Sequence, residues 1–236
     1  MKALRLLPWL ALMVAIAVGI SGYGNKLGWW DYRTAFGVLR VATYAAMAIG
    51  ALSLVLLLVP RARRGRAGML GLTIAFALAA LALPLYWLQL ARNVPPINDI
   101  TTDLADPPEF VTILPIRANA PVSAAYSGKD TADAQRAAYP DIAPIVLAVA
   151  PQAAYARALA IARELGWTIV AADEKTGRIE ATATTAWFGF KDDVVIRIRP
   201  EGNGSRVDVR SHSRVGKSDL GANARRIREF SARLRS

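Results

Sequence analysis

The chain has 236 residues, a formal net charge of +11 and no cysteine. The lack of cysteine excludes disulfides, thiolate zinc sites and thiol catalysis, so any folded domain must be stabilised by its core alone. The charge is uneven, because residues 1–91 carry nine Lys and Arg against one acid, whereas residues 92–236 carry 20 against 17. The basic excess therefore belongs mainly to the first part of the chain, and no nucleic-acid partner is expected.

Three long uncharged stretches fill the first 91 residues, at 6–25, 41–60 and 67–91. Each is close to the ~20 residues that an α-helix needs to cross the hydrocarbon core of a bilayer. We therefore predict a transmembrane anchor over residues 1–91, with three helices at about 5–23, 36–59 and 68–90. The first helix follows a basic start but is followed at once by another span, which favours an uncleaved signal anchor.

The orientation of these helices is predicted from the loop at 60–67, which contains Arg61, Arg63, Arg64 and Arg66. Short loops rich in Lys and Arg stay in the cytoplasm. The N-terminus is then cytoplasmic, and everything after the third helix lies in the periplasm of a bacterial inner membrane. Aromatic residues at the opposite ends of the spans agree with this orientation, since they gather at membrane interfaces.

Arg40 is the one charge near the start of the second span. Ionisable groups inside membranes are often functional, but a long side chain within two turns of the interface also reaches the headgroups by snorkelling. We favour snorkelling.

Residues 92–143 contain seven prolines and no long periodicity. They predict an extended strap rather than a flexible Gly/Ser linker. Apolar residues at 110–116 indicate that parts of the strap pack against another surface.

Regular periodicity begins at Ile145 and predicts an extracytoplasmic α+β domain over residues 144–236. A short apolar run is followed by a helix from Pro151 to about Leu165, because proline suits a first helical turn and Gly166 can end one. Alternating residues then predict four more strands, and an apolar stripe predicts a last helix from about Ser218. The order β-α-β-β-β-β-α is typical of an antiparallel sheet with helices on one face, a two-layer α+β fold.

The second sheet face is strongly charged. It is either solvated or the place where the strap or a partner docks, and it carries Arg178, Glu180, Arg197, Arg199, Arg206, Asp208 and Arg210.

The densest polar run, at 210–227, joins the last strand to the last helix. Ser218 is placed to cap that helix, and free N–H groups beside basic side chains support an anion site with a lipid phosphate as ligand. The alternative, which we favour, is that the arginines pair with nearby carboxylates and build the loop. The residues of this candidate anion or structural motif are Arg210, Ser211, Arg214, Lys217, Ser218, Asp219, Asn223, Arg226, Asp192 and Asp193.

The run 210–227, with WFGFKDDV at 187–194, resembles the family known as domain of unknown function 1499. PPINDITTD at 95–103 and YPDIAP at 139–144 resemble the membrane-anchored branch of that family, which has three N-terminal transmembrane helices. The resemblance spans about 92–236 and implies no established reaction. Many relatives have histidine where this chain has Asn98, so any role of that histidine is lost here.

Catalytic and metal sites find little support in the residues present. His212 is the only histidine, its neighbours Ser211 and Ser213 point to the other face of a strand, and no nucleophile elbow is present. Four acids of the strap have the ligand type that a hard cation prefers, but they lack the glycine-punctuated loop of calcium motifs: Asp99, Asp103, Asp106 and Glu109. We expect no cofactor and no metal.

Two functions follow from these patterns. The leading one is a non-enzymatic inner-membrane protein whose periplasmic α+β domain binds a protein partner or an anionic lipid headgroup. The alternative is an envelope enzyme acting on lipid or glycan through Asp192, Asp193 and the 210–219 region. The bilayer is the one partner that the sequence implies directly, and the oligomeric state is left open.

Overall fold

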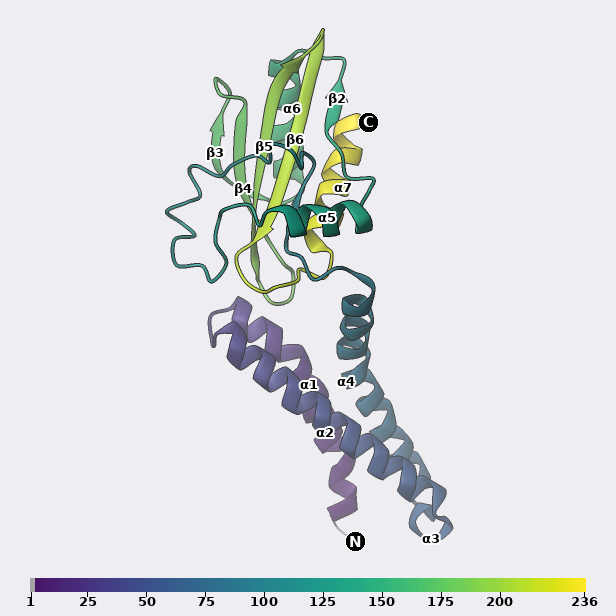
Figure 1. Cartoon of the computed structure of the whole chain (residues 1–236). Coiled ribbons are helices and arrows are strands. Elements are labelled where there is room, and N and C mark those ends of the chain that lie inside the picture. The colour runs from purple at the N-terminus through teal and green to yellow at the C-terminus, as the bar shows by residue number, and fades with distance from the viewer. Residues whose placement is uncertain (1–2) are drawn as a thin grey trace. The chain divides into compact units, whose positions relative to one another are not determined.

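The computed structural model describes residues 3–236, which divide into two compact units (Figure 1). The first unit comprises the chain up to Leu90 together with Ala186–Gly189, and the second comprises Ala91–Thr185 and Phe190–Ser236. The apolar helices belong to the first unit and the sheet to the second. The predicted architecture of three apolar N-terminal helices followed by a mixed α+β sheet domain is confirmed.

The first unit is helical. It contains a short 3-10 turn η1 (Ala3–Leu6), the helices α1 (Leu7–Lys26), α2 (Tyr32–Leu58) and α4 (Ala67–Asn93), and a single turn α3 (Pro60–Arg63) in the arginine loop. Three stretches are long and apolar enough to cross a membrane: Leu4–Lys26, Tyr32–Leu58 and Ala67–Asn93. Asp31 caps α2, because its carboxylate accepts the backbone N–H of Thr34 at 2.8 Å.

The second unit is built on a six-stranded antiparallel sheet. The strands are β1 (Asp99–Thr101), β2 (Ile145–Leu147), β3 (Thr168–Asp173), β4 (Arg178–Thr184), β5 (Lys191–Glu201) and β6 (Gly204–Ser213). Their order is β1-β6-β5-β4-β3, and β2 pairs with β6 beside β1. A two-residue turn at Gly202 and Asn203 joins β5 to β6, and Glu201 pairs with Gly204.

Two helices, α6 (Pro151–Glu164) and α7 (Ala222–Arg235), cover one face of this sheet (Figure 1). Their apolar stripes meet the inward residues of the central strands in the main core, where Ile196 and Val209 are fully buried. Trp167 stacks on Phe230 at a centroid distance of 5.6 Å. The alternation seen in the sequence therefore assigns the helix-facing side of β4, β5 and β6 correctly.

The opposite sheet face, here called the strap face, is covered by the strap. Phe110 and Ile113 pack on Val195 in a second, smaller core. Glu180 of β4 fixes the strap there, since its carboxylate accepts the backbone N–H groups of Val111, Thr112 and Ile113 at 2.8–3.1 Å. Of the alternatives left open for this charged face, the structure shows docking of the strap.

Two elements lie within the stretch expected to be irregular. β1 has only three residues, and α5 (Lys129–Ala138) is polar and follows a glycine with φ of 83°. Two hydrogen bonds connect α5 to β1, because the side chain of Gln135 accepts from the backbone N–H of Thr101 at 3.0 Å and donates to its carbonyl at 2.6 Å. β1 is too short to show an alternation, and α5 has too few large apolar residues to stand out in the sequence pattern.

Candidate functional site

The predicted motif lies at the end of β6 and in the loop before α7, and the strand separates its side chains onto two faces. Arg210 and His212 lie on the strap face. Ser211 and Ser213 point toward α7, where Asn223 contacts both hydroxyls. The motif therefore forms two clusters, a charged one under the strap and a polar one under α7.

Arg210 forms a buried bidentate ion pair with Asp99. Its Nε and Nη2 donate to the two carboxylate oxygens at 2.8 Å each, and the two side chains are 1% and 0% exposed. The guanidinium also donates to the carbonyl oxygens of Pro108 and Ala124 and lies 5.0 Å from the centroid of the Phe110 ring. Because its charge is neutralised and shielded from solvent, Arg210 is not accessible to an external anion.

Arg214 shares its partner, Asp193, with an arginine of the strap. Arg214 donates to both oxygens of Asp193 at 2.9 and 2.7 Å, and Arg117 donates to one of them at 3.2 Å. The hydroxyl of Thr182 donates to the same carboxylate at 2.8 Å. Asp193 thus joins β4, β5, the motif loop and the strap through one fully buried group.

Arg226 organises the cluster under α7. Its Nη2 donates to Asp192 at 2.7 Å and its Nη1 to the hydroxyl of Ser211 at 2.9 Å. Ser211 in turn donates to Asn223 at 2.7 Å. Asp192 and Asp193 consequently lie on opposite faces of the sheet, Asp192 paired with one arginine and Asp193 with two.

The start of the last helix differs from the prediction. α7 begins at Ala222 rather than near Ser218, and Ser218 is not its N-cap residue. The carboxylate of Asp219 accepts the N–H groups of Gly221 and Asn223 at 2.7 Å each. Leu220 and Gly221 have φ of 53° and 74°, a left-handed turn that delays the helix. A carboxylate of the chain itself therefore occupies the N–H groups that would bind an external anion, and burial raises its pKa despite these hydrogen bonds.

His212 is fully buried between charged neighbours. Its Nδ1 lies 3.3 Å from Arg210 Nη2 and 3.5 Å from Asp99 Oδ2, and its Nε2 has no hydrogen-bond partner among residues 3–236. Burial, with the nearby positive charges of Arg117 and Arg210, lowers the pKa of His212 to about 3. The imidazole is therefore neutral at physiological pH, and it contacts neither serine hydroxyl.

Two further positions belong to the loop. Asn98 donates to the carbonyl of Gly216, and its own carbonyl accepts from Ser213 N–H at 3.0 Å and from Asn223 at 2.9 Å. Asn98 thus fastens the loop to the strand before it. Lys217 is exposed and has no charged partner within the described chain.

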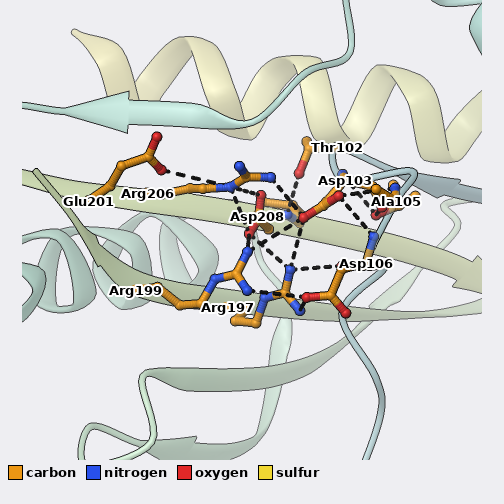
Figure 2. A network of polar contacts seen from close by, with 11 residues as sticks. Thr102, Asp103, Ala105, Asp106, Arg197, Arg199, Glu201, Arg206 and Asp208 are labelled. Carbon is orange, nitrogen blue, oxygen red and sulfur yellow. Dashed lines mark hydrogen bonds and ion pairs between the residues drawn. The ribbon is translucent and has the colours of Figure 1, made fainter.

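Figure 2 shows a second network on the strap face, which sequence reasoning did not assemble. Asp208 is fully buried and accepts from three arginines of β5 and β6 at 2.9–3.0 Å. Asp103 of the strap accepts from the same three arginines, at 2.7–3.5 Å. The arginines are Arg197, Arg199 and Arg206. The strand pattern gave their common face, but the register that sets Arg197 opposite Asp208 comes only with the structure.

Three of the four acids considered for a hard cation are paired with arginines. Asp99 pairs with Arg210, whereas Asp103 and Asp106 pair with Arg197. Among residues 3–236, no group of three or more His, Asp or Glu side chains is arranged to hold a metal ion.

The strap also carries an apolar surface. Within residues 110–117, here called the strap tip, Phe110 and Ile113 face the sheet and are buried. Val111, Leu114 and Ile116 point away from the sheet and are 49%, 45% and 55% exposed. The backbone of the tip is held by Glu180, and Arg117 at its end is anchored on Asp193. The tip is thus an ordered segment that displays three apolar side chains.

Comparison with protein families gives a match over more than half of the chain. The model of the family described as "Protein of unknown function (DUF1499)" matches residues 99–234, which is most of the second unit and includes both charged networks. Comparison with curated proteins finds no match.

Proposed function

The chain belongs to the family described as "Protein of unknown function (DUF1499)", and we propose that it is a non-enzymatic membrane protein whose α+β unit binds another protein through the strap tip. We further propose that it is a multi-pass protein of a bacterial inner membrane, with a cytoplasmic N-terminus and a periplasmic α+β unit. The arginine loop between α2 and α4 supports this orientation.

The observation that carries the proposal is the strap tip. Val111, Leu114 and Ile116 lie within six residues and are exposed. Three backbone hydrogen bonds to Glu180 hold this segment in place, and the side chain of Arg117 at its end bonds to Asp193. An interface that is already ordered loses less conformational entropy on binding. Apolar side chains on such a segment are suited to filling pockets of a partner.

The charge around the tip supports a protein partner over an anionic membrane surface. Segments that lie on such membranes combine apolar residues with exposed Lys and Arg. In the tip, the only basic residue is Arg117, which is 4% exposed and paired with Asp193, and the adjacent Glu109 is exposed. The three arginines of the candidate motif likewise form ion pairs within the chain, with Asp99, Asp192 and Asp193.

The same pairing supports a structural role for the motif and weighs against the alternative of an envelope enzyme. Asp192 and Asp193 lie on opposite sheet faces, so they do not converge on one substrate. His212 is buried and neutral, and neither flanking serine contacts it.

Photo-crosslinking tests the proposal. A photoreactive amino acid replaces Leu114 in the full-length chain in its own cells, and we expect one discrete protein adduct. Ile116→Asp in the same chain should abolish that adduct. Val146→Asp, at a residue of β2 that is 62% exposed, serves as the matched control and should leave it unchanged. The absence of a protein adduct, adducts with lipid alone, or equal loss in both variants would contradict the proposal.

A further inference from the structure

Arg40 has an unusual position among the arginines of the chain. It lies within α2, one of the three helices able to span a membrane, and its side chain makes no hydrogen bond or ion pair with the described residues. Arg33, the second residue of the same helix, donates to the hydroxyl of Tyr32 at 3.3 Å. The unit therefore contains a cation at membrane depth without a counter-charge of its own.

The first unit has no acid to offer Arg40. Asp31 is the only acidic residue in the first 91 positions, and its carboxylate already caps α2. A charged side chain inside a bilayer is costly unless it is paired or reaches the interface. The negative charge that stabilises Arg40 must then come from outside these helices.

The depth of Arg40 can be derived from helix geometry. With a rise of 1.5 Å per residue, α2 is about 40 Å long, or ~10 Å longer than a typical hydrocarbon core. Arg40 is about 12 Å along the axis from Tyr32, which places its Cα ~7 Å inside the core if α2 is centred. At that depth, the guanidinium of Arg40 reaches a lipid phosphate only if the side chain extends toward the interface, the headgroup descends into the core, or both.

A groove in the first unit gives the headgroup room to descend. It has a volume of ≈ 460 Å³ and runs between α2 and α4. Arg33 and Arg40 lie seven residues apart, which is close to two helical turns, so both line the same side of it. Apolar and aromatic side chains complete the lining, including Phe36, Tyr44, Pro84 and Trp87.

We propose that this groove binds an anionic glycerophospholipid. Arg33 and Arg40 hold the phosphate oxygens through charge-assisted hydrogen bonds, and the aromatic residues contact the glycerol and the first acyl carbons. The groove has two arginines, and the one carboxylate of these helices is already used to cap α2. This excess of positive charge favours a lipid with net negative charge over a zwitterionic one. This site does not depend on the proposed protein-binding role of the strap tip.

The test measures lipid binding to the full-length chain in neutral detergent by native mass spectrometry, with phosphatidylglycerol and phosphatidylcholine compared. We expect phosphatidylglycerol to bind the wild-type protein preferentially. Arg40→Gln should weaken that binding by about tenfold or more, and Arg40→Lys should retain part of it, because the charge remains but the bidentate fork is lost. Arg61→Gln is the matched control, since it makes the same charge change in an exposed arginine outside the groove.

A second variant tests the groove without changing charge. Gly37 lines the groove, and a Cβ added there would meet no atom within 4 Å, so Gly37→Leu should fold and fill the space. We expect it to reduce phosphatidylglycerol binding as well.

Four results would overturn the site: equal binding of the two lipids, equal losses in Arg40→Gln and Arg61→Gln, undiminished binding to Gly37→Leu, or full competition by inorganic phosphate. The last would indicate a site for free phosphate rather than for a lipid.

Discussion

Arg210 and Asp99 form an ion pair from which water is excluded on both sides. Burying such a pair costs desolvation energy that the attraction only partly offsets, so the pair adds little net stability compared with apolar residues. Removing one partner is different, because the remaining charge is then buried and unpaired. Asp193 would keep a partner after the loss of one arginine, since two arginines contact it.

This difference predicts an order of stability among arginine variants. Arg210→Ala should lower the free energy of unfolding by about 3–5 kcal/mol, and Arg214→Ala by less, because Arg117 still pairs with Asp193. Arg233→Ala is the control, at an exposed pair with Glu229, and should cost about 0–1 kcal/mol. Thermal unfolding of the full-length protein in neutral detergent, followed by circular dichroism, measures the order. Equal melting temperatures for all three variants would refute the structural role of these pairs.

His212 predicts a pH dependence of stability. Its pKa is about 3 in the folded protein and about 6.5 when unfolded, so the unfolded chain binds the extra proton first as pH falls. Stability from this group is complete above pH 6.5 and declines between pH 6.5 and 3, by up to about 1.4 kcal/mol per pH unit. The raised pKa of Asp99 acts in the opposite direction, because protonation of a group with a raised folded pKa favours the folded state.

The effect of His212 is isolated by comparing the wild type with His212→Gln, which removes the titrating ring and leaves Asp99 in place. As the pH falls from 7.5 to 5, the free energy of unfolding should decrease more in the wild type than in His212→Gln. Parallel stability curves over that range would show that His212 does not titrate as described.

At the scale of the elements, the strap and the sheet are held together mainly by charge. Glu180 binds three backbone N–H groups of the strap tip, Asp103 of the strap joins the arginines in Figure 2, and Arg117 reaches Asp193. The apolar contact between the two layers is small by comparison, since it consists chiefly of Phe110, Ile113 and Val195.

Glu180→Gln should therefore loosen the strap tip without unfolding the sheet. The variant loses the negative charge, and only one side-chain oxygen remains to accept from three backbone N–H groups. We expect this to weaken the attachment by about 1–3 kcal/mol. Hydrogen exchange should rise at residues 110–117 and stay unchanged in β5 and β6. Glu174→Gln, at an exposed residue of the β3–β4 turn, is the control. Exchange that rises across the whole sheet would mean that Glu180 supports the fold rather than the strap.

The sequence predicts the helix-facing side of the sheet well and the strap poorly, for a physical reason. Alternation along a strand is local, so Ile179 and Ala181 were correctly separated from Glu180 and Arg178. The pairing of Asp99 with Arg210 joins residues 111 positions apart, and nothing local specifies it. The sequence was sufficient to predict that the motif residues lie near one another. Their division between two sheet faces depends on the strand register, and the cap by Asp219 depends on the left-handed turn at Leu220.

At the scale of the whole molecule, three helices able to span a membrane precede an α+β unit whose charged motif is paired internally and whose strap tip is exposed. These helices can be predicted directly from the sequence, because length and apolarity alone identify helices able to span a bilayer. It does not reveal the exposed tip, since only the packing of Phe110 and Ile113 turns Val111, Leu114 and Ile116 outward.

The absence of cysteine makes one measurement direct, because each single Cys variant carries one thiol. Leu114→Cys reports on the strap tip, and Ala137→Cys on an exposed position of α5. A maleimide that does not cross membranes is applied to intact spheroplasts and to protein purified in lipid nanodiscs. We predict that Ala137→Cys is labelled in both preparations, whereas Leu114→Cys is labelled in nanodiscs but protected in spheroplasts by its protein partner. Equal labelling of both variants in spheroplasts, protection of Leu114→Cys by nanodisc lipid alone, or labelling of Ala137→Cys only after lysis would contradict the account.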